Sequence, residues 1–338
     1  MLRVLLLCLL LAACSRESAS PAATGVAAAP ALYPVVLQLD WYAQPEHGGF
    51  YQAVAKGYYQ DEGLAVEIRP GANLNTIPQL VATGRVTFAL GVLDRMLVQR
   101  SQGVPLVTLF PYFQHDPQCI LFHTESGIRT LADLKGREVM LQPGLIYIDF
   151  LQKALGLDLH LLPMDYSLTR FLRDKQFVQQ CFLTNEPLIL RKQGIDAGVI
   201  PLSASGFDPY RHVYTNEEQI KQHPAQVAAF IRASLRGWRD FMDGDPLPAF
   251  TLIAQSNAEQ TVQLQQEERG EMLRYSLTDG DAGKGETLGQ YNKARLRKVM
   301  EQLQQLQLLR DPLVLETTAA LALLPPELVV DSSAATTQ

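Results

Sequence analysis

Apolar positions along the chain switch between the periods expected of strands and of helices. Residues 33–40 place Val35 and Leu37 on one face, with the period of two that is typical of a strand. Residues 46–59 carry apolar side chains four apart, which favours a helix, and residues 64–68 alternate again. Strand, helix and strand within about 35 residues predict a βαβ unit, and such a unit requires a parallel sheet.

This alternation continues to about residue 110 and restarts near Gln118. The first stretch predicts helices at 75–82 and 93–102 and strands at 87–92 and 104–110. The second stretch predicts strands at 138–141, 177–183 and 197–202 and a helix from Gly144 towards Leu155. Long helical patterns follow at 224–242 and 296–306. The expected fold class is α/β: two lobes of mostly parallel sheet flanked by helices, with a cleft between them.

We expect the first lobe to be interrupted by the second. Residues 33–116 and 214–330 would form the first lobe and residues 117–213 the second, because a helical C-terminal third follows the two α/β patterns. The hinge would lie near 114–117 and 210–215, where prolines and polar flanks suit chain crossings. The periodicity alone also permits two sequential domains.

The first 14 residues have the pattern of a cleaved signal peptide. One positive charge precedes the apolar run 4–11, which is shorter than the about 20 residues needed to span a bilayer. The run leads into Leu11-Ala12-Ala13-Cys14, which resembles the lipobox of bacterial lipoproteins and implies lipidation of Cys14. A plain secretory signal is the alternative. Residues 15–32 are expected to form a flexible tether, and residues 331–338 a disordered tail.

Composition and motifs exclude several classes of protein. The formal net charge is −6 and no basic cluster marks a nucleic-acid surface. No nucleophile elbow, zinc-binding helix or Cys-x-x-Cys pair occurs, so no enzyme activity, metal or cofactor is expected. Cys119 and Cys181 leave two alternatives open, a disulfide or two small buried apolar side chains. Glu267 and Glu268 are expected on a solvated helix face.

An ordered series of short motifs resembles one family of periplasmic solute-binding proteins. The motifs are Asp40-Trp41, Glu46-His47-Gly48-Gly49-Phe50-Tyr51, Ala55-Lys56-Gly57-Tyr58-Tyr59, Gln102-Gly103-Val104-Pro105, Leu134-Lys135-Gly136, Thr184-Asn185-Glu186-Pro187, Gly237-Trp238 and Leu324-Pro325-Pro326. The family serves ABC importers; its members include binders of thiamine-pyrimidine precursors, and sulfonate binders are close relatives. The resemblance implies the type II binding-protein fold, with a ligand held between two closing lobes.

Candidate ligand contacts on the first lobe follow predicted strand ends, where α/β sheets open a crevice. Trp41 comes directly after the first strand, and its indole suits a flat ring; a core aromatic is the alternative. His47 offers a donor or acceptor, or is locally bonded in the first turn of a helix. Gly91 permits close approach of backbone, and Asp94 accepts from an amino group or caps the next helix.

Candidate contacts on the second lobe lie at two predicted helix starts. Gly144 opens a helix whose free N–H groups would face the cleft, and Tyr147 is a lid aromatic or a core residue. Asn185 and Glu186 offer a donor–acceptor pair for an aminopyrimidine edge. In the alternative, Thr184 or Asn185 caps the helix that begins there, and Glu186 interacts favourably with the helix dipole.

A fungal synthase of the thiamine pyrimidine shares the fold that the resemblance implies. The cofactor-binding lysine and the histidine of that enzyme would fall at Gly91 and Arg95 here, and its cysteine-rich motif is absent, since Cys181 stands alone. The sequence therefore disfavours this chemistry.

These observations predict a lipid-anchored substrate-binding protein of an ABC importer, on the periplasmic side of a bacterial cell membrane, with the outer membrane as the alternative site of the anchor. We expect a monomer that captures a small planar polar ligand, a thiamine-related aminopyrimidine, and passes it to a permease in the inner membrane. The alternatives are a ligand sensor for a membrane receptor and a binder of a sulfonate or riboflavin-like solute.

Overall fold

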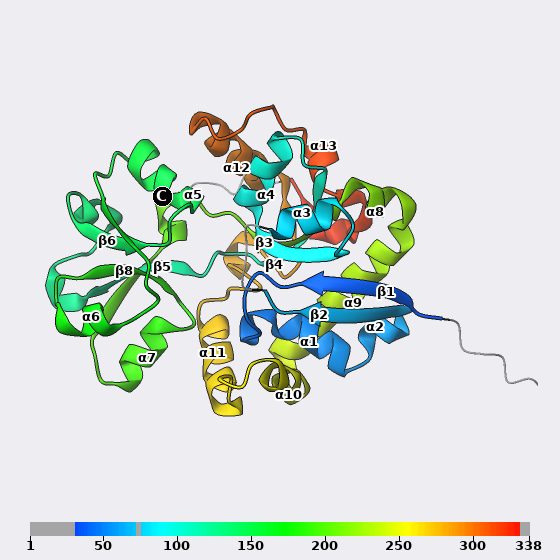
Figure 1. The fold of residues 1–338 in the computed structure, drawn as a ribbon, viewed down its shortest axis with the longest axis horizontal. Coiled ribbons are helices and arrows are strands. Elements are labelled where there is room, and N and C mark those ends of the chain that lie inside the picture. The colour runs from blue at the N-terminus through cyan, green and yellow to red at the C-terminus, as the bar shows by residue number, and fades with distance from the viewer. Residues whose placement is uncertain (1–30, 72–75, 332–338) are drawn as a thin grey trace, which may run out of the picture. The chain divides into compact units, whose positions relative to one another are not determined.

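The computed structural model describes residues 31–71 and 76–331. Two five-stranded sheets, each flanked by helices, form two lobes (Figure 1), which confirms the predicted α/β class. The predicted signal peptide, Cys14, most of the tether and all of the tail except Asp331 lie outside the described residues. Among the helices of the described ranges, none combines the length and apolar character that crossing a bilayer requires.

The first lobe is built on a sheet with the strand order β2-β1-β3-β10-β4. Its strands are β1 (Tyr33–Gln38), β2 (Leu64–Arg69), β3 (Phe88–Val92), β4 (Leu106–Phe113) and β10 (Arg211–Asn216). Strand β1 pairs in parallel with β2 and β3, whereas β10 runs antiparallel to β3 and β4. Residues that come late in the sequence are thus inserted into a sheet formed by early ones.

Helices cover the first lobe and extend through the last third of the chain (Figure 1). They are α1 (Gly48–Ala55), α2 (Tyr58–Asp61), α3 (Ile77–Ala82), α4 (Leu93–Ser101), α8 (Glu217–Gln222), α9 (Pro224–Asp243), α10 (Leu247–Ser256), α11 (Val262–Arg274), α12 (Lys293–Gln305) and α13 (Leu315–Thr318). The helix predicted over 46–59 is a 3₁₀ turn (Pro45–His47) followed by α1 and α2, because Gly57 has a φ of +73° and ends the first helix. Short strands β11 (Tyr291–Asn292) and β12 (Val329–Val330) form a separate pair.

The second lobe is built on a sheet with the strand order β7-β6-β8-β5-β9. Its strands are β5 (Gln118–His123), β6 (Glu138–Leu141), β7 (His160–Pro163), β8 (Val178–Phe182) and β9 (Ala197–Pro201), and its helices include α5 (Ile146–Asp149), a π-helix (Phe150–Ala154), α6 (Thr169–Arg173) and α7 (Glu186–Lys192). Strand β5 runs antiparallel to β8 and β9. Each lobe thus has a single antiparallel strand within its five-stranded sheet.

The two cysteines left open by the sequence form a disulfide. Cys119 on β5 faces Cys181 on β8 in the strand register, with their Cα atoms 4.9 Å apart. Antiparallel neighbours at this separation suit a disulfide bridge. The bond therefore ties the antiparallel strand of the second lobe to its central neighbour.

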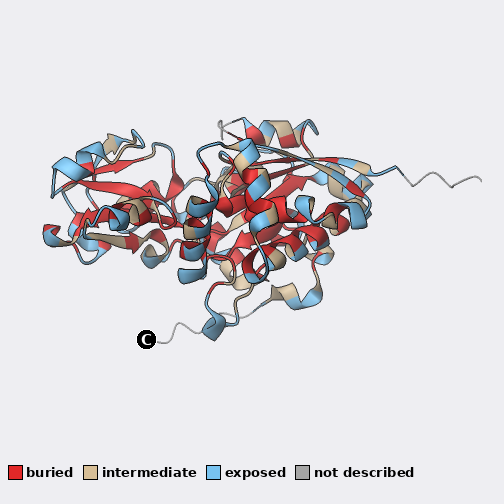
Figure 2. Ribbon diagram, turned by 90° about the horizontal axis from the view of Figure 1, so that it is seen from below, coloured by how far each residue is buried: buried red, intermediate tan, exposed pale blue. Residues whose placement is uncertain are grey.

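Two short segments carry the chain between the lobes. The first runs over residues 114–117, between β4 and β5, and the second over residues 206–210, ahead of β10. The second lies earlier than the predicted 210–215, because Arg211–Asn216 pairs with β3 and β4 as a strand. The edge strands β2, β7 and β9 are mostly intermediate or exposed, whereas β4 and β5, on either side of the first crossing, are buried along their whole length (Figure 2).

Candidate ligand-binding site

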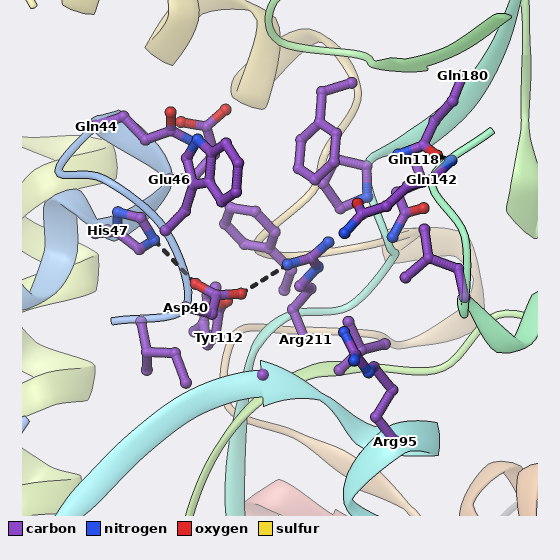
Figure 3. A pocket seen from close by; sticks show the side chains of 18 of the residues that line it. Asp40, Gln44, Glu46, His47, Arg95, Tyr112, Gln118, Gln142, Gln180 and Arg211 are labelled. Carbon is purple, nitrogen blue, oxygen red and sulfur yellow. Dashed lines mark hydrogen bonds and ion pairs between the residues drawn. The ribbon is translucent and has the colours of Figure 1, made fainter. Parts of the chain in front are cut away.

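A cavity of about 310 Å³ lies between the lobes and is lined by residues of both. The first lobe contributes residues that follow β1 and β3 and the start of β10, and the second lobe contributes the start of β5 and the ends of β6 and β8. Figure 3 shows polar side chains from both lobes pointing into this space. The volume lies at the lower end of the range of about 300–1,000 Å³ that small-molecule sites occupy.

The base of the cavity is a buried network of charged groups. Arg211 Nη1 lies 2.8 Å from Asp40 Oδ2, and His47 Nε2 lies 3.1 Å from Asp40 Oδ1 (Figure 3). Arg211 Nε also lies 3.2 Å from Asp116 Oδ2. Burial would raise the pKa of Asp40, but the hydrogen bond with His47 and the charge of Arg211 outweigh it and lower the pKa to about 2. The network therefore holds Asp40 ionised and leaves Arg211 shared between two carboxylates.

An aromatic pair from the two lobes meets at the edge of the cavity. The rings of Trp41 and Tyr166 lie 5.9 Å apart with their planes inclined by 35°, and both residues line the cavity. Tyr166 is 60 % exposed, so this contact is at the solvent side. Trp41 follows β1 as the sequence predicted, and its indole adjoins a space where a flat ring can stack.

Three carboxyl groups from three different segments line one part of the cavity: Glu46, Glu186 and Glu268. Thr184 donates a hydrogen bond to Glu46 Oε1 from the opposite lobe, while Glu46 Oε2 and Glu268 Oε2 are buried without a partner among the described residues. Burial and the charge of Glu46 raise the pKa of Glu268 to about 9. This end of the cavity is thus rich in acceptors and holds at least one protonated carboxyl near neutral pH.

Glu186 is the first residue of a helix and faces the cavity. Its Oε2 accepts a 2.8 Å hydrogen bond from the backbone N–H of Phe182, and it begins α7. Burial is the main cause that raises the pKa of Glu186, and the charge of Glu46 adds to it. Glu186 therefore lines the cavity from the first turn of α7, whereas no side chain within the described ranges caps the N-terminus of this helix.

Amide side chains line the wall formed by the second lobe. Gln118 begins β5, Gln142 follows β6 and Gln180 lies within β8 (Figure 3). Gln180 Oε1 accepts hydrogen bonds from Tyr147 Oη at 2.7 Å and from the backbone N–H of Gln142 at 3.0 Å. Gln118 Oε1 is buried without a partner in the described part of the chain.

The structure brings five of the predicted contact residues to the cavity wall: Trp41, His47, Gly91, Asn185 and Glu186. Three others lie outside its lining. Asp94 is buried with its carboxylate turned back to the N–H of Arg95 at 2.6 Å, and burial raises its pKa to about 7. Gly144 occupies a turn with a φ of +80°, two residues ahead of a helix of four residues. Tyr147 lies behind Gln180 rather than over the cavity.

The sequence analysis did not predict several residues that line the cavity. Arg211 belongs to a strand that was not predicted, and Glu268, expected on a solvated face, is 5 % exposed. Glu268 is buried because α11 packs beside the 3₁₀ turn that carries Glu46. The polar pair Gln179 and Gln180 inside a predicted apolar strand was a usable signal, since a polar residue within a buried strand needs a partner.

The two lobes, the two crossings and the cavity between the lobes define a periplasmic binding-protein fold. The solved aliphatic sulphonate binding protein SsuA from Escherichia coli is similar, with a TM-score of 0.65, 12 % identity, and coverage of 84 % of this chain and 91 % of that protein. The chain belongs to the NMT1/THI5-like family, whose model matches residues 44–246.

Two curated relatives are named for the ligands that they bind. The riboflavin-binding protein RibY of Chloroflexus aurantiacus is 30 % identical over 270 residues, which cover 74 % of this chain and 76 % of the relative. The formylaminopyrimidine-binding protein of Halalkalibacterium halodurans is 27 % identical over 285 residues, covering 81 % of this chain and 84 % of that protein.

Proposed function

We propose that this chain is the solute-binding subunit of an ABC importer and captures a small planar nitrogen heterocycle between its lobes. The observation that carries the proposal is that Trp41 of the first lobe and Glu186 of the second line the same cavity. A ligand that contacts both walls stabilises the closed arrangement, because it interacts with each lobe only when they are together.

The chemistry of the lining favours an aminopyrimidine-type ring. Trp41 offers a face for stacking, and Asn185 and Glu186 offer a donor and an acceptor to the edge of a ring. The compounds in the names of the two relatives, riboflavin and formylaminopyrimidine, both contain a pyrimidine ring. A thiamine-related aminopyrimidine is therefore our first candidate, and a riboflavin-like solute is the second.

Gly91 supports ligand binding without catalysis, because it occupies the position where the related synthase would carry its cofactor-binding lysine. Gly91 lines the cavity, and a Cβ added there would lie 3.2 Å from Tyr214 Cε1. A longer side chain at this position would require Tyr214 to move. The glycine thus suits close approach of a ligand to the backbone of β3 better than a covalent role.

We further propose that the protein acts as a monomer on the periplasmic side of the membrane, attached through a lipidated Cys14, and delivers its ligand to a permease. A sensor that reports ligand occupancy to a membrane receptor is the alternative. Permease and ATPase genes beside the gene would support import, and a receptor gene in their place would support sensing.

Isothermal titration calorimetry tests the ligand class. The panel is formylaminopyrimidine, hydroxymethylpyrimidine and riboflavin, with taurine and nitrate as controls of different chemistry. Saturable heat with a pyrimidine or with riboflavin, and none with the controls, is the expected result. Heat with taurine or nitrate alone, or with none of the panel, would refute the proposal.

A further inference from the structure

The amide of Gln180 has one orientation fixed by its neighbours. Both hydrogen bonds to it, from Tyr147 Oη and from the N–H of Gln142, fall on Oε1. The phenol O–H and the backbone N–H both donate to this oxygen. If the two ends of the amide were exchanged, the NH₂ group would face the backbone N–H, and two donors cannot form a hydrogen bond. The NH₂ group of Gln180 is therefore the end left for the cavity, which this residue lines.

Gln118 supplies the complementary group on the same face of the sheet. In the antiparallel register Ile120 pairs with Gln180, and Gln118 lies two residues before Ile120. Side chains two residues apart point to the same face of a strand, so Gln118 is a diagonal neighbour of Gln180. Gln118 is 5 % exposed and its Oε1 lacks a partner among the described residues, which leaves an acceptor to be satisfied.

We propose that Gln118, Gln142 and Gln180 form an amide wall that binds a secondary amide group of the ligand, with Tyr147 as the positioning residue. The N–H of Gln180 donates to the ligand carbonyl, and Gln118 Oε1 accepts from the adjacent ligand N–H. This inference rests on the proposed function and deepens it, because it assigns a chemical group to the second wall.

Two candidate ligands carry this group in different forms. Formylaminopyrimidine has a formamide on its side chain, and riboflavin has an N–H between two carbonyls in its ring. Hydroxymethylpyrimidine retains the aminopyrimidine ring and lacks the amide, so it serves as the matched probe. The ring itself would be held at Trp41 and Glu186 in either pyrimidine, and only the amide group would reach the wall.

Calorimetry with these three compounds tests the amide wall on the native protein. We expect formylaminopyrimidine to bind at least about tenfold more tightly than hydroxymethylpyrimidine, because a buried donor and acceptor go unpaired with the second compound. Equal affinity for the two pyrimidines would overturn the amide wall while leaving the proposed function intact. If riboflavin binds and neither pyrimidine does, the amide wall would contact the ring N–H and carbonyl groups of riboflavin. The variants described below then test that contact.

Three variants separate a direct contact from a structural role. Gln180→Met should weaken the tightest of the three probes about tenfold or more, since it removes the donor at similar length. Tyr147→Phe should weaken it less, and the double variant should match Gln180→Met, because Tyr147 acts only through Gln180. Gln193→Met, at an exposed site on the same lobe, is the control and should bind as the native protein does.

The double variant decides the role of Tyr147. Additive losses from Tyr147→Phe and Gln180→Met would show that the tyrosine acts independently and would overturn the positioning role. Unchanged affinity in Gln180→Met, with its fold verified by thermal unfolding, would overturn the amide wall. A native protein that binds none of the probes refutes the proposed function and this inference together.

Discussion

Arg211 Nη1 lies 2.8 Å from Asp40 Oδ2, so the first residue of β10 is joined to the residue that follows β1 by two positions, across 171 residues of sequence. At the base of the cavity Asp40 is buried and the side chain of Arg211 is 11 % exposed, and Asp116 shares the same guanidinium. A buried ion pair adds little stability over an apolar replacement of both partners, but removing one partner leaves a charge without compensation. The pair is therefore most sensitive to loss of the shared cation.

Arg211→Met should destabilise the fold by about 3–5 kcal/mol at pH 7, because Asp40 and Asp116 would stay buried without their cation. The pKa of Asp40 would rise from its value of about 2, so the loss should shrink as the pH falls and the carboxyl groups take up protons. Urea unfolding at pH 7 and at pH 4.5 measures this difference. Arg310→Met, at an exposed arginine, is the control and should change stability by less than about 1 kcal/mol.

Glu268→Gln should reduce the pH dependence of stability between about pH 5 and pH 9. The folded state holds the pKa of Glu268 at about 9, above the ordinary 4.5. The contribution of Glu268 to the free energy of unfolding is therefore fully present below pH 4.5 and is lost as the pH rises towards 9. Glutamine does not titrate, so the variant lacks this loss. Between pH 5 and pH 8.5 the free energy of unfolding of the native protein should fall by about 1–3 kcal/mol more than that of the variant. Thermal unfolding across this range measures it. Parallel curves for native and variant protein, or the same change in the exposed control Glu301→Gln, would contradict it.

Ligand binding should quench fluorescence from Trp41. The chain contains two tryptophans, and Trp238 is fully buried in the first lobe, so a ligand in the cavity reaches only the other. Trp41→Ala should weaken binding by about 1–3 kcal/mol and abolish the quenching. Trp41→Phe should abolish the quenching but retain more of the affinity, because a ring face remains. Quenching that survives in Trp41→Phe would place the ligand elsewhere.

Reduction of the Cys119–Cys181 disulfide should destabilise the second lobe. The bond closes a loop with a sequence separation of 62, for which the gain from constraining the unfolded chain is about 2–4 kcal/mol. Denaturant unfolding with and without dithiothreitol measures the loss, and a thiol assay of the denatured protein checks the pairing. The Cys119→Ala/Cys181→Ala variant should unfold at the same denaturant concentration with and without dithiothreitol. A native protein whose unfolding ignores the reductant would contradict the prediction.

Periodicity predicted the elements whose neighbours lie close in the sequence. The α/β class and the long helix α9 followed from apolar spacing, because one buried face per element dictates that spacing. Strand β10 was missed because its polar residues, among them His212 and Thr215, are buried through partners far away in the chain. Local pattern carries no information about such distant partners.

The candidate site shows the same limit. Trp41 and Glu186 were found because each follows a predicted strand, and strand ends line the crevice of an α/β sheet. Glu268 was expected in solvent, because an acidic residue on a charged helix has no local sign of burial, and its neighbour Glu46 comes from the opposite end of the sequence. The pairing of Cys119 with Cys181 depends on strand register, which spacing does not reveal.

Gln118 and Arg211 share an unusual position: each is the first residue of the single antiparallel strand of its sheet, directly after the chain has passed from one lobe to the other. Points next to a pivot travel least when two bodies turn about it. Opening the lobes about these passages would thus keep the guanidinium and the first amide almost stationary while residues farther out separate. Arg211 and Gln118 would therefore already be in position when the ligand enters. Only lining residues farther from the two crossings would have to move to enclose the ligand.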